Sequence, residues 1–98
     1  MGDANGASDV QIRNNADANR FEAKVGSEVA VIQYQMRGDT IDLQHTIVPP
    51  QLEGAGIGSA LAAYALEYAR INSLCVIPTC SFIAAYIKSH PEYADLVS

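Results

Sequence analysis

The sequence predicts a single α+β domain: an antiparallel β-meander, then a β-α-β unit and a short C-terminal helix. Three observations support this class. Apolar residues alternate with polar ones over residues 20–47, with short glycine turns between the segments. After three alternating glycines (Gly54, Gly56 and Gly58) the hydrophobic period changes to about 3.6. A short apolar run over residues 74–78 follows, as the second strand of a crossover would.

The first elements are an N-terminal tail and an edge strand. Residues 1–8 are small and polar, which predicts a mobile tail, and residues 9–98 form the domain. Val10 and Ile12 alternate with polar neighbours, which predicts a short edge strand before a turn at residues 14–19.

Three strands are expected at residues 20–25, 28–36 and 40–48, joined by turns at Gly26 and Gly38. Each strand should bury one face. The residues expected on these faces are Phe21, Ala23, Val25, Ala30, Ile32, Tyr34, Met36, Ile41, Leu43, His45 and Ile47. Two prolines at 49–50 end the last strand, because proline has no N–H to donate to a sheet.

A long helix should begin at Ile57, because Ile57, Leu61, Ala65 and Tyr68 form one buried stripe. The apolar run after it is typical of a strand covered on both faces, which would place Cys75 in the core.

A second, shorter helix is expected over residues 80–88, with Thr79 as its N-cap. His90 and Pro91 end that helix. A final turn should then dock Tyr93 and Leu96 on the domain.

Composition narrows the function classes. The chain has 98 residues and a formal charge of −5, which argues against non-specific binding of nucleic acid and suits a cationic or amine partner better. Its two cysteines do not form a disulfide framework, and it shows neither a signal peptide nor an apolar run that could span a membrane. We therefore expect a cytoplasmic protein. No Cys, His or Asp spacing indicates a metal site.

The glycine segment has two interpretations. A helix N-terminus after a turn without side chains can hold a phosphate on its unpaired N–H groups, or the glycines can simply allow a tight turn and close packing. A P-loop is excluded because no lysine follows Gly58. A dinucleotide fold is excluded because the chain has only one candidate crossover.

Five segments together resemble the small, minimal branch of the GCN5-related N-acetyltransferase superfamily. They cover nearly everything after the tail and read RFE at 20–22, HTIVP at 45–49, LEGAGIGSAL at 52–61, IPTC at 77–80 and HPEYADLV at 90–97. The resemblance implies a fold with a splayed pair of parallel strands that binds acetyl-coenzyme A. The implied reaction moves an acetyl group to an unidentified amine or thiol, on a small molecule or a protein.

The resemblance also implies a set of coenzyme-binding residues. The arm of coenzyme A would lie along Ile47 and Val48, its phosphates on the loop, and its nucleotide end near Tyr86 and Lys88, although packing or solvated roles fit the last two equally well. The loop residues are Gly54, Ala55, Gly56, Ile57, Gly58 and Ser59.

The loop departs from the family's pattern in one important way. Glu53 replaces the usual Arg or Gln, and Ala55 stands where a basic residue is frequent. We therefore expect backbone amides to hold the phosphates, Glu53 to point to solvent, and the affinity for coenzyme A to be weakened.

Cys80 and His45 are the candidate catalytic residues. A thiol at a helix N-terminus becomes more reactive, although a small buried cysteine is the commoner case. His45 lies in the strand before the glycines, where a buried structural histidine is the plainer interpretation. If both face one cleft, the pair supplies a nucleophile and a base for a covalent acyl intermediate. Direct attack by an amine, with His45 or a water as base, is equally compatible.

Three functions stay open at this point. The chain is an acetyltransferase, or a module that binds coenzyme A with little transfer, or an interaction domain whose glycines serve packing alone.

Overall fold

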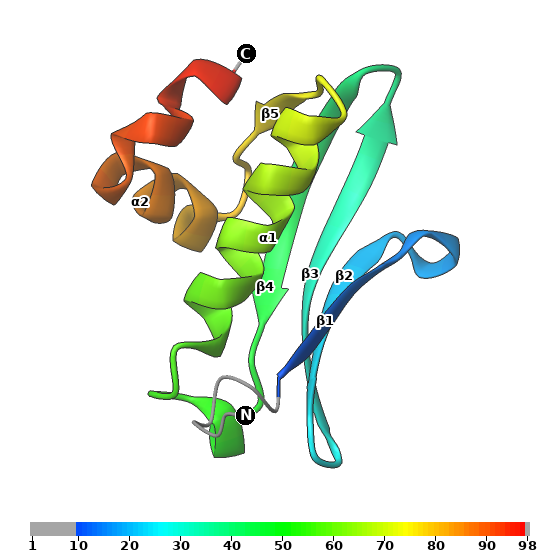
Figure 1. Ribbon diagram of the computed structural model, residues 1–98, viewed down its shortest axis with the longest axis vertical. Helices are drawn as coiled ribbons and strands as arrows, with labels where there is room; N and C mark the ends of the chain where they lie inside the picture. The colour runs from blue at the N-terminus through cyan, green and yellow to red at the C-terminus, as the bar shows by residue number, and fades with distance from the viewer. Residues whose placement is uncertain (1–9, 98) are drawn as a thin grey trace.

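The computed structural model describes residues 10–97, so the predicted tail at residues 1–8 lies outside the described residues. A five-stranded sheet with strand order β1-β2-β3-β4-β5 forms the centre of the molecule. Successive strands from β1 to β4 are antiparallel, and β5 pairs parallel to β4 (Figure 1). The strands are β1 (Gln11–Asn15), β2 (Arg20–Val25), β3 (Glu28–Arg37), β4 (Thr40–Ile47) and β5 (Cys75–Ile77).

Two α-helices lie on one face of this sheet. The long helix α1 (Ile57–Ile71) packs on β2, β3, β4 and β5, and α2 (Ser81–Ser89) lies beside it (Figure 1). The described residues also contain three 3-10 helices: η2 (Ala16–Ala18), η3 (Pro50–Leu52) and η4 (Pro91–Leu96). The predicted α+β order is therefore confirmed, including the parallel β4–β5 pair. Among the described residues, no helix is long and apolar enough to cross a membrane.

The meander forms as its alternation predicts. Two-residue turns at Gly26 and Gly38 connect its strands, and both glycines have a positive φ that other residues rarely adopt. The core-facing residues of β2 and β3 are buried, and so is the first half of β4. They are Phe21, Ala23, Ala30, Ile32, Tyr34, Ile41 and Leu43.

The predicted stripe of α1 covers this apolar face. Ile57, Leu61 and Ala65 are buried, and Tyr68 packs partly buried against the core. Its ring lies edge-on to Phe21, with 5.3 Å between the ring centroids. Phe21 thus anchors the helix to the centre of the sheet.

Strand β5 differs from the prediction. Val76 is fully buried, but Cys75 and Ile77 on either side of it are exposed. Because β5 is the edge strand and the helices cover one face of the sheet, only every second residue meets the core. The expectations of a strand covered on both faces and of a core Cys75 are wrong.

Strand β4 contains a β-bulge that the alternation did not predict. Tyr34 pairs with Leu43 and Gln33 with His45, so Gln44 is an extra residue in the ladder. The extra residue reverses the faces beyond it. His45 and Ile47 are exposed on the sheet face opposite α1, and Thr46 takes the core side. The expected continuous face of Ile41, Leu43, His45 and Ile47 is therefore wrong after Leu43, and Met36 at the end of β3 is exposed as well.

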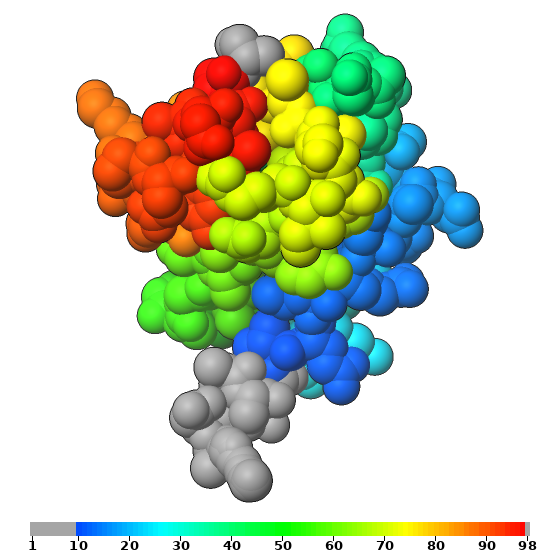
Figure 2. Space-filling model, turned by 45° about the horizontal axis from the view of Figure 1, so that its top comes forward, coloured from blue at the N-terminus to red at the C-terminus, as the bar shows by residue number. Residues whose placement is uncertain are grey.

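The C-terminal segment docks as expected. Tyr93 and Leu96 of η4 are buried, and Figure 2 shows residues 91–97, in red, packed against the second half of α1. The Tyr93 hydroxyl donates to Glu67 at 2.8 Å, which raises the pKa of Tyr93 to about 12. His90 ends α2: its Nδ1 lies 2.8 Å from the Tyr86 carbonyl oxygen, and its ring stacks on the Tyr86 ring.

Candidate functional site

The two parallel strands, β4 and the edge strand β5, separate partway along β4. Their pairing ends at Asp42 and Ile77, and the last backbone bond between the two segments runs from Cys80 N–H to the Leu43 carbonyl at 2.9 Å. Beyond that point β4 continues to Ile47 while β5 has ended. Within residues 10–97, the β4 backbone from Gln44 onward therefore has no strand partner on its β5 side.

The glycine loop lies at one end of this opening. Gly54 and Gly56 have φ values of +84° and +78°, and Gly56 is the N-cap of α1. The first intrahelical bond runs from Ala60 N–H to the Gly56 carbonyl, so the N–H groups of residues 57–59 have no acceptor within the helix.

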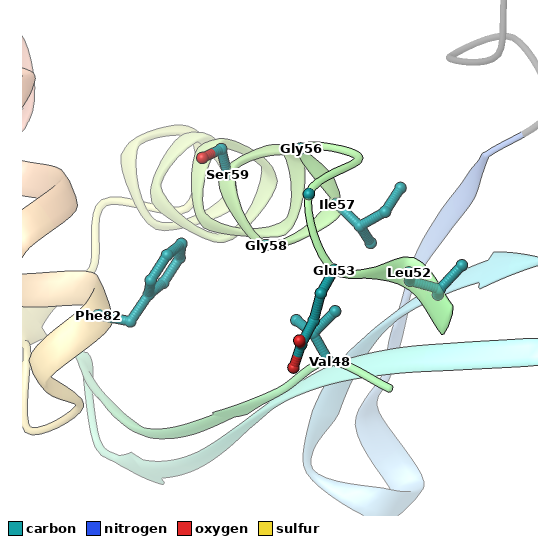
Figure 3. Close-up of a pocket in the computed structure, with 9 residues that line it drawn as sticks. Val48, Leu52, Glu53, Gly56, Ile57, Gly58, Ser59 and Phe82 are labelled. Carbon is teal, nitrogen blue, oxygen red and sulfur yellow. The ribbon is translucent and has the colours of Figure 1, made fainter. Parts of the chain in front are cut away.

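A hollow opens at these N–H groups, between the first turn of α1 and the first turn of α2 (Figure 3). Glu53 is exposed, as expected, but it lines the hollow instead of pointing away from it. Of the described residues that line the hollow, it is the only charged one. The lining residues are Val48, Leu52, Glu53, Gly54, Gly56, Ile57, Gly58, Ser59 and Phe82. The backbone charge at the helix start favours an anion there, while the Glu53 carboxylate opposes one.

Gly58 has a different role from the other two glycines. It lies in the first turn of α1, and a Cβ atom added to it would lie 3.1 Å from Cζ of Phe82. Close packing against the Phe82 ring therefore favours glycine at position 58, whereas positive φ angles favour glycine at positions 54 and 56.

Cys80 stands at the other end of the opening, as the N-cap residue of α2. Its Sγ lies 3.3 Å from Oγ1 of Thr46, the residue that the bulge turns toward the core side. Partial burial raises the pKa of the Cys80 thiol. Hydrogen bonds from the Thr46 hydroxyl and from backbone groups of Ile83, Phe82 and Thr46 lower it by more, so that the net pKa is below its usual value.

A buried carboxylate holds the segment that carries Cys80. Asp42 is only 6% exposed, and it accepts a hydrogen bond from the Thr79 hydroxyl. It also accepts bonds from Arg37 Nη2 at 3.3 Å and from Gln44 Nε2 at 3.4 Å. The prediction that Thr79 is the N-cap of α2 is therefore wrong. Cys80 holds that position, and the Thr79 hydroxyl donates to Asp42 instead.

His45 lines the same surface hollow as Cys80, but it is not the hydrogen-bond partner of the Cys80 thiol. The side-chain partner of Cys80 is Thr46, and His45 is exposed on the outer face of the sheet. The hollow is lined by Gln33, Gln44, His45, Thr46, Ile47, Thr79, Cys80 and Ser81. His45 and Cys80 thus line the same hollow, but the side chain that contacts the thiol is the hydroxyl of Thr46 and not the imidazole of His45.

Of the remaining predicted positions, Ile47 and Val48 lie at the same opening, whereas Lys88 and Ala55 line none of its hollows. Ile47 lines the hollow at Cys80 and Val48 lines the one at the glycines, so the end of β4 links the two. Tyr86 lines a shallow depression together with Ser59 of α1. Lys88 is exposed on α2 and lies outside that depression, and Ala55 does not line the glycine hollow.

Sequence reasoning missed Thr46 and Asp42. A carboxylate within the apolar strand pattern of residues 40–48 was a usable signal for Asp42. Nothing local to the sequence marks Thr46, because its orientation depends on the bulge. Among residues 10–97, no group of three or more His, Cys, Asp or Glu side chains is arranged to hold a metal ion.

Sequence similarity to known proteins indicates the family of this chain. The family described as GCN5-related N-acetyl-transferase matches residues 20–96. Protein NATD1 of Xenopus tropicalis is 31% identical over 88 residues, which covers 87% of this chain and 81% of that protein. Protein NATD1 of Gallus gallus is 33% identical over 85 residues, with 84% and 77% covered.

A solved structure agrees with the sequence relatives. The NMR structure of a GCN5-like protein from Staphylococcus aureus, itself proposed to be an N-acetyltransferase, superposes with a TM-score of 0.72 at 29% identity. The match covers 93% of this chain and 90% of that one. This chain belongs to the GCN5-related N-acetyltransferase family.

Proposed function

We propose that the protein transfers an acetyl group from acetyl-coenzyme A to an amine, and that Cys80 carries the group between them. The observation that supports this most directly is the Cys80–Thr46 contact at the open end of β4, together with the lowered pKa of the thiol. A thiol with a lowered pKa provides more thiolate at neutral pH, and the thiolate is the nucleophile.

The residues around the opening suit coenzyme A. The N–H groups of residues 57–59 would hold its phosphates, and the open edge of β4 at Ile47 and Val48 would accept its amide-containing arm. Tyr86, beside Ser59, would pack on the nucleotide end, with Lys88 further along α2. The coenzyme supplies an activated thioester.

Acetyl transfer through Cys80 takes two steps and needs no reactant besides acetyl-coenzyme A and the acceptor amine. The thiolate Sγ forms a bond to the acetyl carbonyl carbon, and the bond from that carbon to the coenzyme sulfur breaks. The coenzyme leaves as a thiolate that takes up one proton. The acceptor amine then attacks the acetyl group on Cys80, loses a proton to His45 or water, and frees the Sγ atom.

Intact-mass measurement after incubation with acetyl-coenzyme A tests this route. The wild type should gain one acetyl group, and Cys80→Ala should gain none. Cys75→Ala is the matched control, because Cys75 is a free and exposed thiol and should not carry the group. An adduct that disappears with Cys75→Ala and persists in Cys80→Ala would contradict the proposed role of Cys80.

Turnover without any adduct would indicate direct transfer instead. In that route the amine attacks the thioester itself, with His45 or a water as base, and Cys80 is dispensable. Release of free coenzyme thiol in the presence of an amine, measured for wild type and Cys80→Ala, separates the two routes.

The second candidate function is a module that binds coenzyme A with little transfer, and one observation favours it. Glu53 places a carboxylate in the hollow where the phosphates would lie, and its charge would oppose their binding. Calorimetric binding of coenzyme A without turnover would support this alternative. We further propose a cytoplasmic location, since both cysteines are free thiols in the structure.

A further inference from the structure

We propose that the acceptor amine carries an anionic group at its far end, and that cations on the outer face of β1 and β2 bind that group. This inference rests on the proposed acetyl transfer and adds the chemical class of its acceptor: an amine joined to a carboxylate or a phosphate. The binding surface is the cationic hollow, lined by Gln11, Arg13, Arg20, Glu22, Lys24 and Val29.

The cationic hollow gathers positive charge on an acidic protein. The chain has six Lys and Arg residues and a formal charge of −5. Three of these cations line the hollow, and Glu22 is the one carboxylate among its lining residues. Its formal charge is therefore about +2, opposite in sign to the protein as a whole, which favours an anionic ligand at this place.

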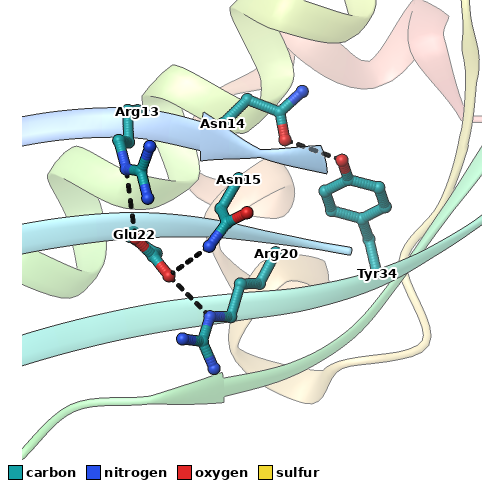
Figure 4. Close-up of polar contacts among 6 residues, drawn as sticks. All are labelled: Arg13, Asn14, Asn15, Arg20, Glu22 and Tyr34. Atoms are coloured by element: carbon teal, nitrogen blue, oxygen red, sulfur yellow. Dashed lines mark hydrogen bonds and ion pairs between the residues drawn. The ribbon is translucent and has the colours of Figure 1, made fainter. Parts of the chain in front are cut away.

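Glu22 orients the two arginines without using their terminal nitrogens. It accepts bonds from Nε of Arg13 at 3.2 Å and from Nε of Arg20 at 2.7 Å, and Asn15 Nδ2 donates to it at 2.9 Å (Figure 4). Hydrogen bonds from Asn15, Arg20 and Arg13 lower the pKa of Glu22 to about 2, so it is ionised at neutral pH.

The other two arginines of the chain, in contrast, use their terminal nitrogens in hydrogen bonds. Arg37 donates from Nη2 to Asp42, and Arg70 donates from both Nη1 and Nη2 to Asp95. Within the described residues, the hydrogen bonds of Arg13 and Arg20 run through Nε alone. Their terminal nitrogens thus stay available for another acceptor, and this pair of donors matches the oxygens of a carboxylate or phosphate.

The strand register connects the cationic hollow to Cys80. Arg20 pairs with Gln33, and Gln33 pairs with His45, so the three side chains lie in one row on the outer face. Gln33 and His45 both line the hollow at Cys80. With neighbouring strands about 4.8 Å apart, the Arg20 backbone lies roughly 10 Å from that of His45. An acceptor of about this length would place its amine in the hollow that His45 and Cys80 both line, and its anion at Arg20.

Matched amines test the inference. 6-Aminohexanoate and 6-aminohexyl phosphate carry the two anionic groups, and hexylamine lacks both. We expect kcat/KM for coenzyme release to be about 10-fold higher with an anionic amine than with hexylamine, which corresponds to one added charge-assisted hydrogen bond. This ratio should fall toward one in Arg20→Gln and in Lys24→Gln. It should persist in Arg70→Gln, which removes the same charge elsewhere.

A binding measurement keeps this result separate from the proposed transfer. In the ¹⁵N-labelled full chain, 6-aminohexanoate should shift the amide signals of residues 20–24, and hexylamine should not. Lys24→Gln serves if Arg20→Gln does not fold, because Lys24 is exposed and takes no part in the Glu22 bonds.

The outcomes separate the two ideas. Equal use of all three amines, or the absence of these shifts, would overturn the anion site while leaving acetyl transfer intact. The specific shifts without transfer to any amine would support the anion site and refute the transfer.

Discussion

Thr46 Oγ1 lies 3.3 Å from Cys80 Sγ, although 34 residues separate the two in the chain. The contact exists because the bulge at Gln44 turns Thr46 to the core side of β4, and because the bond from Cys80 N–H to the Leu43 carbonyl holds the start of α2 beside that strand. The thiol thus has a hydroxyl as its immediate partner, with the imidazole of His45 on the opposite face of the strand.

Replacing Thr46 by Val should make Cys80 less reactive. The change removes the hydroxyl, which is the largest of the contributions that lower the pKa of Cys80, and leaves the shape of the side chain nearly unchanged. The pH midpoint for alkylation by iodoacetamide should therefore rise. The measurement belongs in a Cys75→Ala background, where Cys80 is the only thiol, and Thr46→Ser should restore the wild-type midpoint. An unchanged midpoint in Thr46→Val would show that backbone donors alone set the reactivity.

Asp42→Asn should lower the stability of the domain. The amide keeps the size of the carboxylate, but it has one acceptor oxygen where Thr79, Arg37 and Gln44 now share two. Weakening bonds to a buried charged group costs about 1–3 kcal/mol in free energy of unfolding. Urea unfolding measures the loss. Asp17→Asn, which removes the same charge at the exposed helix η2, should change the stability by less than about 0.5 kcal/mol. A similar loss for both variants would assign no special role to Asp42.

Glu53→Gln should tighten the binding of coenzyme A. The substitution removes the one negative charge among the described residues that line the hollow at the start of α1, and it leaves the backbone N–H groups in place. Because Glu53 is exposed, the gain should be modest, about 3- to 10-fold in Kd by calorimetry. Raising the salt concentration should reduce the difference between variant and wild type. Weaker binding by Glu53→Gln would mean that this carboxylate assists the ligand.

Glu22 should contribute stability that depends on pH. Its pKa falls from 4.5 in the unfolded chain to about 2 in the folded protein, so the ionised form is favoured by folding. The contribution is present above about pH 4.5 and is lost as the pH falls toward 2. The stability difference between wild type and Glu22→Gln should therefore shrink over this range. Unfolding free energies measured at several acidic pH values would show it, and a constant difference would contradict the assigned pKa.

The fold was predictable because its signals are local. Alternation defines β2 and β3, glycines mark the turns at Gly26 and Gly38, and a change of period marks the start of α1 at Ile57. The parallel β4–β5 pair follows from the order of the elements. Each of these inferences uses residues that are neighbours in the sequence.

The wrong predictions, which concern the burial of β5 and the faces of β4 beyond Leu43, both arise from how the strands are arranged in the sheet. Whether Cys75 is covered depends on β5 being an edge strand with helices on one side, and the position of Thr46 depends on how β4 pairs with β3. Neither property is encoded within the strand that shows it. The sequence could therefore place Cys80, His45 and Ile47 around one opening, but it could not identify the hydroxyl that contacts the thiol.

The contact between Gly58 and Phe82 has a mechanical consequence. Phe82 lies two residues after Cys80 in the first turn of α2, and a Cβ atom at position 58 would be in tight contact with its ring. The first turn of α1 and the first turn of α2 therefore pack against each other through the Phe82 ring. Any ligand that pushes on the first turn of α1 also presses on the turn that carries the cysteine. The glycine end and the thiol end of the opening are thus in mechanical contact through Gly58 and Phe82.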